Sequence, residues 1–380
     1  MKEIHCVEGG ADEVQARGHR SVVRLANGLV PALVTIAVIL PLIGGCTDPS
    51  GPPQQVGGAA QCLIDTDFVV SGGVSRDGIP ALTDPPFVSP DHADAAYLEP
   101  GDRIVGLVIN GEALAVPHNT LWWHEIVNLN HRGIALSVTY CPMTGSSIVF
   151  DRAGAGGAEF GVSGLLFQNN LMMYDRRDPP SLWPQMSRGA RCGPEIGRPL
   201  DSFPAVDMRW DGWLELHPDT RVVSGALGFG RNYGLYPYGS YESDAPFLVD
   251  MPFHDDRLFA KERVLGLPAE RGAAIAFPIV STERWRVAEF DYAGAAAVVF
   301  WDRDKQAAVA LRPVVDDMWL TFDARPEGIF DHQTQSRWSV VGAALEGPLA
   351  GEDLDIIPEA YVSFWGAWSV FEPGSRIWEN

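Results

Sequence analysis

The sequence predicts a mainly β protein with a few short helices, built from two related halves. Short hydrophobic runs end at Gly, Pro, Asn or Asp, which is typical of strands joined by turns. The 40 glycines and 29 prolines of this 380-residue chain supply many such turns. The hydrophobic pattern of residues 132–152 also matches that of residues 293–313 without a gap. We therefore expect an internal duplication, with two β halves packed about a pseudo-two-fold axis.

The repeat extends toward the C-terminus, where residues 181–221 and 336–376 share a skeleton of large and turn-forming residues. The matching pairs are Trp183/Trp338, Gly193/Gly347, Gly197/Gly351, Leu200/Leu354, Pro204/Pro358, Trp210/Trp365, Trp213/Trp368, Pro218/Pro373 and Arg221/Arg376. Residues kept in both halves are expected to serve the shared fold. Reactive residues present in only one half become the candidates for function.

The individual elements follow from the hydrophobic runs. Strands are expected at 104–109, 113–116, 134–140, 146–150 and 160–162, and in the second half at 264–267, 274–277, 295–301, 307–311 and 319–322. A short helix is expected over 91–97. The segment 119–130 predicts a longer helix capped by Asn119, whose spacing would place His124 and Asn128 on one face.

The N-terminal 45 residues are typical of an export signal. Arg17, Arg20 and Arg24 precede the apolar run 25–43, and Gly44 and Gly45 stand before Cys46. This ending resembles a bacterial lipobox, so we expect Cys46 to be lipidated and to hold the exported protein on the outer face of a bacterial membrane. An uncleaved transmembrane anchor is the alternative, because the run is long enough to span a bilayer.

Composition divides the rest of the chain. Residues 46–60 predict a flexible tether, 61–222 the first repeat with the candidate site, 223–263 an aromatic interrepeat segment, and 264–380 an architectural second repeat. The net charge of −21 would repel phosphate backbones, so nucleic acid is not expected as a partner. Cys62, Cys141 and Cys192 would remain in the folded part, which allows at most one disulfide and leaves its pairing open.

Comparing the repeats isolates a group of reactive side chains in the first one. His124 and Glu125 stand where the second repeat has Trp285 and Arg286. They could act as a metal ligand and a general base, with Asn128 nearby as a ligand contact. The alternative is a buried histidine bonded to Asn128 or to a backbone carbonyl.

Cys141 stands opposite Asp302 in this alignment. It could be a nucleophile, or it could join His124 and Met143 in binding a copper or zinc ion. The alternatives are a small buried cysteine and one half of a disulfide.

Two further segments could contact a small-molecule ligand. Asp175 follows Phe160 by fifteen positions, whereas Asp331 follows Phe322 by nine, and the extra length lies near the expected polar loop 163–170. Its Ser163, Gln168 and Asn169 could orient a ligand or cap their own loop. In the interrepeat segment, a group of one arginine and three tyrosines could recognise an anion or a sugar, or form a structural cluster. Its members are Arg231, Tyr233, Tyr238 and Tyr241.

Several motifs in one order resemble a known family. They are His-Glu-Ile-Val-Asn at 124–128, Thr-Tyr-Cys-Pro-Met-Thr-Gly at 139–145, the segment 161–185, and the late motifs at 347–351 and 362–368. From Ser71 to the C-terminus the chain is similar to the bacterial and archaeal family called domain of unknown function 3179. The resemblance implies no particular reaction. It implies a turn with two cysteines, and because Thr144 replaces the second, a dithiol redox role is not expected here.

Three hypotheses follow. The first is a lipid-anchored envelope protein with a ligand or metal site in the first repeat, which could be an enzyme with Cys141 as nucleophile and His124 as base. The second is a non-catalytic module that binds a glycan or another small molecule. The third is a purely structural role for all of these residues.

Overall fold

The computed structural model describes residues 61–244, 246–269, 273–281 and 283–378. The predicted export signal, the tether and Cys46 lie outside the described residues. The fold is mainly β, as predicted, with three short α-helices and several 3-10 turns in the described part. None of the helices described is long and apolar enough to cross a membrane.

The first half begins with short strands β1 (Val69–Ser71), β2 (Leu82–Thr83) and β3 (Phe87–Val88), and with the turns η1 (Thr66–Phe68) and η2 (Ala93–Ala95). A short helix was expected over 91–97, and the single 3-10 turn η2 forms there instead. The main elements follow: β4 (Arg103–Ile109), β5 (Glu112–Pro117), α1 (His118–His124), β6 (Ile126–His131), β7 (Ile134–Cys141), β8 (Ser146–Asp151), η3 (Arg152–Ala155), β9 (Gly161–Phe167), β10 (Asn170–Tyr174), β11 (Leu182–Pro184), η4 (Gln185–Ser187), β12 (Val206–Arg209), α2 (Trp210–Leu216) and β13 (Arg221–Val223).

The second half presents its elements in a similar order. They are β14 (Arg263–Leu267), β15 (Ile275–Pro278), β16 (Trp285–Tyr292), β17 (Ala295–Asp302), β18 (Ala307–Leu311), β19 (Val314–Val315), β20 (Met318–Trp319), β21 (Phe322–Arg325), β22 (Gly328–Asp331), β23 (Arg337–Trp338), β24 (Ala344–Glu346), β25 (Tyr361–Phe364), α3 (Trp365–Phe371) and β26 (Arg376–Ile377). Most expected strands are therefore confirmed within one or two residues.

Corresponding strands pair in the same way in the two halves. The order β12-β4-β5-β13 in one sheet matches β25-β14-β15-β26 in another, and the last strand of each runs parallel to its neighbour. Trp213 of α2 packs against Gly106, and Trp368 of α3 packs against Gly266, so closely that a Cβ on either glycine would overlap the indole. The small residue in each strand thus admits a buried tryptophan.

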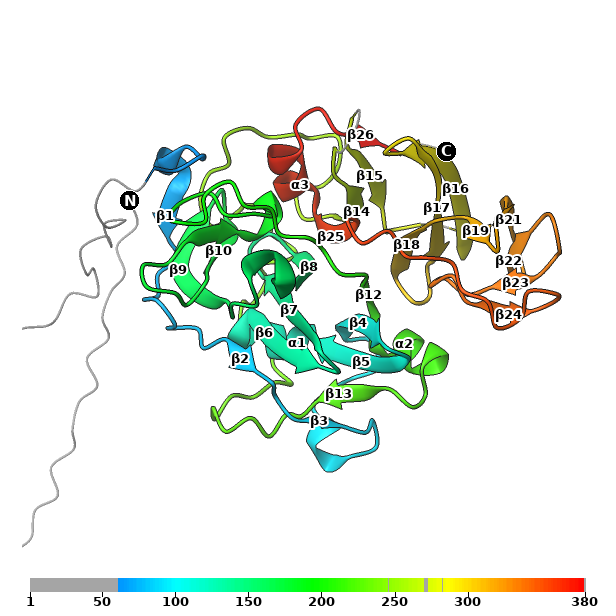
Figure 1. The fold of residues 1–380 in the computed structure, drawn as a ribbon, viewed down its shortest axis with the longest axis horizontal. Helices are drawn as coiled ribbons and strands as arrows, with labels where there is room; N and C mark the ends of the chain where they lie inside the picture. Colours follow the sequence, from blue (N-terminus) through cyan, green and yellow to red (C-terminus); the bar gives the residue numbers. More distant parts are fainter. Residues whose placement is uncertain (1–60, 245, 270–272, 282, 379–380) are drawn as a thin grey trace, which may run out of the picture. The chain divides into compact units, whose positions relative to one another are not determined.

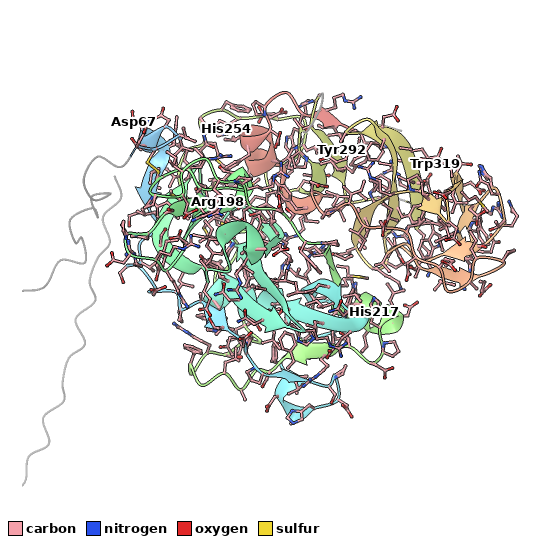
Figure 2. All side chains as sticks on the ribbon, viewed as in Figure 1. Asp67, Arg198, His217, His254, Tyr292 and Trp319 are labelled. Atoms are coloured by element: carbon pink, nitrogen blue, oxygen red, sulfur yellow. A yellow bond between two sulfur atoms is a disulfide. The ribbon has the colours of Figure 1, made fainter. Side chains whose placement is uncertain are left out.

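The two halves complete each other's sheets and cores. Strand β25 of the second half pairs with β8 of the first through Val362 and Ser147, so one sheet continues from β6-β7-β8 into β25-β14-β15 (Figure 1). One hydrophobic core joins Phe160 and Trp183 of the first half to Trp368 of α3. Another joins α2 and β4 to β17, β18 and Trp338. His217, labelled in Figure 2, follows α2, and its ring packs at a tilt against Trp213 with ring centroids 4.1 Å apart.

The expected helix over 119–130 is wrong in its second part. Helix α1 ends at His124, and Glu125 adopts a φ of 56°, which cannot continue a right-handed helix. Residues 126–131 then form β6, paired with β7 over its whole length. The β-branched Ile126 and Val127 favour the strand, and burial on both faces removes the alternation that would have revealed it.

The expected polar loop at 163–170 is also wrong. Residues 161–174 form the hairpin β9–β10, and its turn residues Gln168 and Asn169 both have a positive φ, as a two-residue hairpin turn requires. The hairpin is longer than its counterpart β21–β22. The extra residues noted in the sequence therefore lengthen two paired strands.

Candidate functional site

Glu125 stands at the junction between α1 and β6. Its N–H donates to the carbonyl of Leu121 at 2.8 Å, and its own carbonyl accepts from the N–H of Tyr140 at 2.8 Å. These two bonds hold the residue at a positive φ, which is uncommon for residues other than glycine. Such a conformation costs free energy, of order 1 kcal/mol, and is often found at functional sites.

Glu125 lines a cavity of about 350 Å³. The residue is only 8% exposed, and none of the described side chains forms a hydrogen bond or an ion pair with the carboxyl. Burial raises the pKa of Glu125 to about 8. At neutral pH the group is therefore largely a protonated acid in an apolar enclosure.

The other walls of this cavity are predominantly apolar. They are formed by Met143 from the turn after β7, by Val162, Leu165 and Leu166 of β9, and by Leu171 of β10. The hairpin β9–β10, which was expected to be a loop, thus forms one side of the cavity.

Two tyrosines of the interrepeat segment close another side. The hydroxyl of Tyr238 donates to the carbonyl of Trp122 at 3.1 Å, and that of Tyr241 donates to the carbonyl of Met143 at 2.9 Å. Both residues line the cavity, but their hydroxyls are already engaged with the backbone. Among the described polar side chains that line the cavity, only the Glu125 carboxyl has no protein partner and could bind a ligand.

His124 lies next to Glu125 but serves a different contact. Its Nδ1 lies 2.7 Å from the carbonyl oxygen of Pro80, and its Nε2 lies 2.7 Å from the hydroxyl of Tyr233. Burial lowers the pKa of this imidazole, so it is neutral at physiological pH. Since Pro80 can only accept, Nδ1 carries the proton and Nε2 accepts from Tyr233. His124 is therefore a buried histidine bonded to a backbone carbonyl, as the alternative hypothesis from the sequence expected.

Cys141 is a buried free thiol behind the cavity wall. Its Sγ accepts from the N–H of Leu171 at 3.3 Å and donates to the carbonyl of Asn169 at 3.5 Å. Burial, followed by the charge of Glu125, raises the pKa of Cys141 to about 11. The thiolate that a nucleophile requires is therefore scarce at neutral pH.

The disulfide joins Cys62 to Cys192, across 130 residues of sequence. The alternative that Cys141 is half of a disulfide is wrong. The bridge connects the first described residues to the segment after η4, and Cys141 remains reduced.

The residues considered for a copper or zinc ion do not fit one in this arrangement. A ligand histidine needs a free ring nitrogen, and both nitrogens of His124 already have protein partners. Met143 lines the cavity, while the Cys141 thiol is bonded to the hairpin backbone. The described part of the chain contains no group of three or more His, Cys, Asp or Glu side chains placed for a metal.

The hairpin residues are satisfied by neighbouring backbone. Ser163 donates to the carbonyl of Met172 and accepts from the N–H of Leu165 at 3.1 Å. Asn169 exchanges two hydrogen bonds with the backbone of Val249, at 2.7 and 2.8 Å. Gln168 occupies the hairpin turn, where its N–H donates to the carbonyl of Phe68 at 3.2 Å. The hairpin tip thus binds the interrepeat segment.

Asn128 and Arg231 lie in separate places. Asn128 is buried on β6, where it donates to the carbonyl of Phe160 at 2.9 Å and accepts from the hydroxyl of Ser137 at 2.7 Å. Arg231 is exposed, and its guanidinium lies over the ring of Trp123, 5.0 Å from the centroid. Of the sequence-predicted residues, Glu125, Met143, Tyr238 and Tyr241 line the cavity, and Cys141 lies behind it.

The sequence comparison missed two buried polar clusters. In one, Gln185 accepts from Ser146, and Asn170 donates to Gln185 and Thr144 at 2.9 and 3.0 Å. Thr144, at the position of the missing second cysteine, is therefore held in a hydrogen-bond network.

In the second cluster, Asp207 binds Arg103 at 2.6 Å and His118 at 3.0 Å. Burial alone would raise the pKa of Asp207, but Arg103 and His118 outweigh it and hold the pKa well below its usual range. The alignment of residues 181–221 with 336–376 holds a signal for these polar residues, because Gln185 and Asp207 stand opposite Val340 and Val362.

A family model described as "Protein of unknown function (DUF3179)" matches residues 76–375, which is most of the chain. The chain belongs to this family. The resemblance seen in the sequence motifs is thereby confirmed, and the DUF3179 match includes Glu125, Met143, Tyr238 and Tyr241 of the cavity. Comparison with curated proteins and with solved structures found no match.

Proposed function

We propose that this protein binds a small molecule in the cavity beside Glu125. The observation that carries the proposal is the Glu125 carboxyl itself, which is enclosed among apolar side chains and meets no protein partner among the described residues. Burying a polar group without a partner is unfavourable, and a bound ligand would supply that partner. A cavity with apolar walls and a few polar groups is the usual form of a small-molecule site.

The arrangement favours binding over Cys/His chemistry. The His124 ring is occupied on both sides, and the raised pKa of Cys141 leaves little thiolate. Glu125 differs from both, because it lines the cavity and its carboxyl has no partner among the described side chains. The non-catalytic small-molecule module is therefore the hypothesis that the geometry supports best.

A neutral fluorescent probe tests whether the cavity takes a ligand. N-phenyl-1-naphthylamine becomes brighter in apolar surroundings, and we expect saturable one-site binding to the wild-type protein. Leu165→Trp, which fills the cavity from β9, should weaken binding at least tenfold. Leu345→Trp, on an exposed position of β24, should leave it unchanged. A probe response that is not saturable, or that survives Leu165→Trp, would contradict the proposal.

We also propose that the protein is exported and anchored to a bacterial membrane through a lipid on Cys46. The basic flank, the apolar run and the small residues before Cys46 support this location. Radiolabelled palmitate should be incorporated into the wild-type protein and not into Cys46→Ala. An unlabelled protein that stays in the membrane fraction would instead indicate the uncleaved transmembrane anchor.

We infer further that the two halves arose by duplication and are related by a pseudo-two-fold axis. The identical strand orders and the two tryptophan–glycine contacts support this inference. So do two matching turns, in which Asp175 accepts from the N–H of Ser181 at 2.8 Å and Asp331 accepts from that of Ser336 at 2.9 Å. The second half carries Arg286 in place of Glu125, so the ligand site belongs to the first half alone.

A further inference from the structure

We infer that the ligand of the Glu125 cavity is an amphiphilic amine, whose ammonium group pairs with Glu125 while its apolar part fills the rest of the cavity. This inference rests on the proposed function. It adds the chemical class of the ligand, which the apolar walls alone do not define.

The first reason is the kind of polar group that the cavity offers. An ionised carboxylate accepts hydrogen bonds and offers no donor, which suits an ammonium group with three N–H donors. The hydroxyls of Tyr238 and Tyr241 are engaged with the carbonyls of Trp122 and Met143, so they do not compete to donate to the ligand. In low-dielectric surroundings a carboxylate–ammonium contact is much stronger than it is in water.

The second reason is the aromatic wall. With their hydroxyls turned to backbone carbonyls, Tyr238 and Tyr241 contribute mainly ring surface to the cavity. Aromatic rings attract organic cations, and the combination of rings with one carboxylate is a favourable environment for an ammonium group. The Tyr241 ring already contacts one ammonium, because Lys261 Nζ lies 3.3 Å from its centroid.

The third reason is the electrostatic environment. No cation acts appreciably on the Glu125 carboxyl, so this charge is not neutralised within the described protein. The net charge of −21 also favours the approach of cations over that of anions.

Binding of an ammonium ion requires Glu125 to ionise, so its proton is released to solvent as the complex forms. Affinity should therefore rise with pH up to about 8, by roughly 50-fold between pH 6 and pH 8. The groups around Glu125 on the neighbouring elements are His124, Cys141 and Tyr238. Burial lowers the pKa of His124, and it raises the pKa of Cys141 to about 11 and that of Tyr238 further.

Among the described residues, Lys261 also titrates in this range and could imitate the behaviour. Burial lowers its pKa to about 8, and it lies over Tyr241. Loss of its charge would also favour a bound ammonium as pH rises. Glu125→Gln separates the two effects, because it removes the carboxylate and keeps Lys261.

The experiment compares 2-phenylethylamine with 2-phenylethanol, which have similar shape and differ in charge. Each displaces N-phenyl-1-naphthylamine from the full-length protein at pH 6, 7 and 8. We expect the amine to bind at least tenfold more tightly than the alcohol at pH 8. In Glu125→Gln the amine should lose at least tenfold in affinity and its dependence on pH, while the alcohol should change less than threefold.

The outcomes separate the two proposals. Alcohol binding that equals or exceeds amine binding would overturn the amine inference and leave the cavity as a ligand site. An amine affinity or pH dependence that survives Glu125→Gln would also overturn it. Failure of the naphthylamine probe to bind the wild-type protein would overturn the proposed function itself.

Discussion

The hydroxyl of Tyr233 lies 2.7 Å from Nε2 of His124, and this bond ties the interrepeat segment to helix α1. The same helix ends at His124, directly before Glu125, and the same segment supplies Tyr238 and Tyr241 to the cavity. Asn169 adds a second tie through the backbone of Val249. Together these contacts set the position of the aromatic wall relative to the carboxyl.

Tyr233→Phe should destabilise the protein by about 1–3 kcal/mol, because it leaves the buried Nε2 of His124 without a donor. Urea denaturation at pH 7 measures the change. Tyr236→Phe is the matched control, since the Tyr236 hydroxyl is enclosed and lacks a hydrogen-bond partner among the described residues. That substitution should be neutral or slightly stabilising. Equal losses in both variants would show that the His124 contact is not responsible.

The stability difference between Glu125→Gln and the wild type should depend on pH. The pKa of Glu125 is about 8 in the folded protein and near 4.3 in the unfolded chain, so the folded state keeps a proton that the unfolded state loses. Wild-type stability should therefore fall as pH rises from about 4.3 to 8, by at most about 1.4 kcal/mol per pH unit from this group, and then level off. Glu125→Gln should lack this contribution. Parallel urea curves at pH 5, 6, 7, 8 and 9 measure it, and a difference that stays constant across them would contradict the buried acid.

The three cysteines in the described part should differ in reactivity. Iodoacetamide should modify Cys141 only after unfolding, because the thiol is buried and its pKa is raised to about 11. Cys62 and Cys192 should react only when their disulfide has also been reduced. Peptide mass spectrometry resolves each site. Rapid alkylation of Cys141 in the native protein would disprove its enclosure.

Gly106→Ala and Gly266→Ala should each destabilise the protein by more than about 2 kcal/mol. A Cβ at these positions would lie 2.5 Å from Trp213 and 2.2 Å from Trp368, so the tightly packed indoles would have to move. Thermal unfolding should show a lower Tm for both variants. Gly101→Ala, where the nearest atom is 3.9 Å away, is the control and should change Tm little. A large loss at only one of the two sites would argue against equivalent roles in the two halves.

Much of the architecture was predictable because strands leave a local signature. The runs that form β4, β7, β8, β17 and β18 are hydrophobic, short and bounded by turn residues. The prediction of a helix over 119–130 was wrong in its second part because a strand buried on both faces shows no alternation of polar and apolar residues. Nothing in the local sequence marks the positive φ of Glu125. The prediction of a loop at 163–170 was wrong because the polar residues at the turn of the β9–β10 hairpin resemble those of a loop.

The candidate site could be predicted only in part. Comparing the repeats selected His124, Glu125, Cys141 and the segment 163–170, because the second half has other residues or fewer residues at these positions. It could not say that His124 would bond to Pro80 and Tyr233, since these partners are distant in sequence. Nor could it place Leu171 or Tyr238, which reach the cavity from other elements.

The sequence by itself determined that this is a mainly β protein of the DUF3179 family, with reactive side chains in its first half. These properties follow from residue type and local order along the chain. Tertiary structure alone decided that Cys62 pairs with Cys192, that His124 is fully bonded, and that Glu125 is the polar group left facing a cavity. The reason is physical: burial and hydrogen bonding depend on which distant segments meet, and they set both the pKa of a side chain and its freedom to bind.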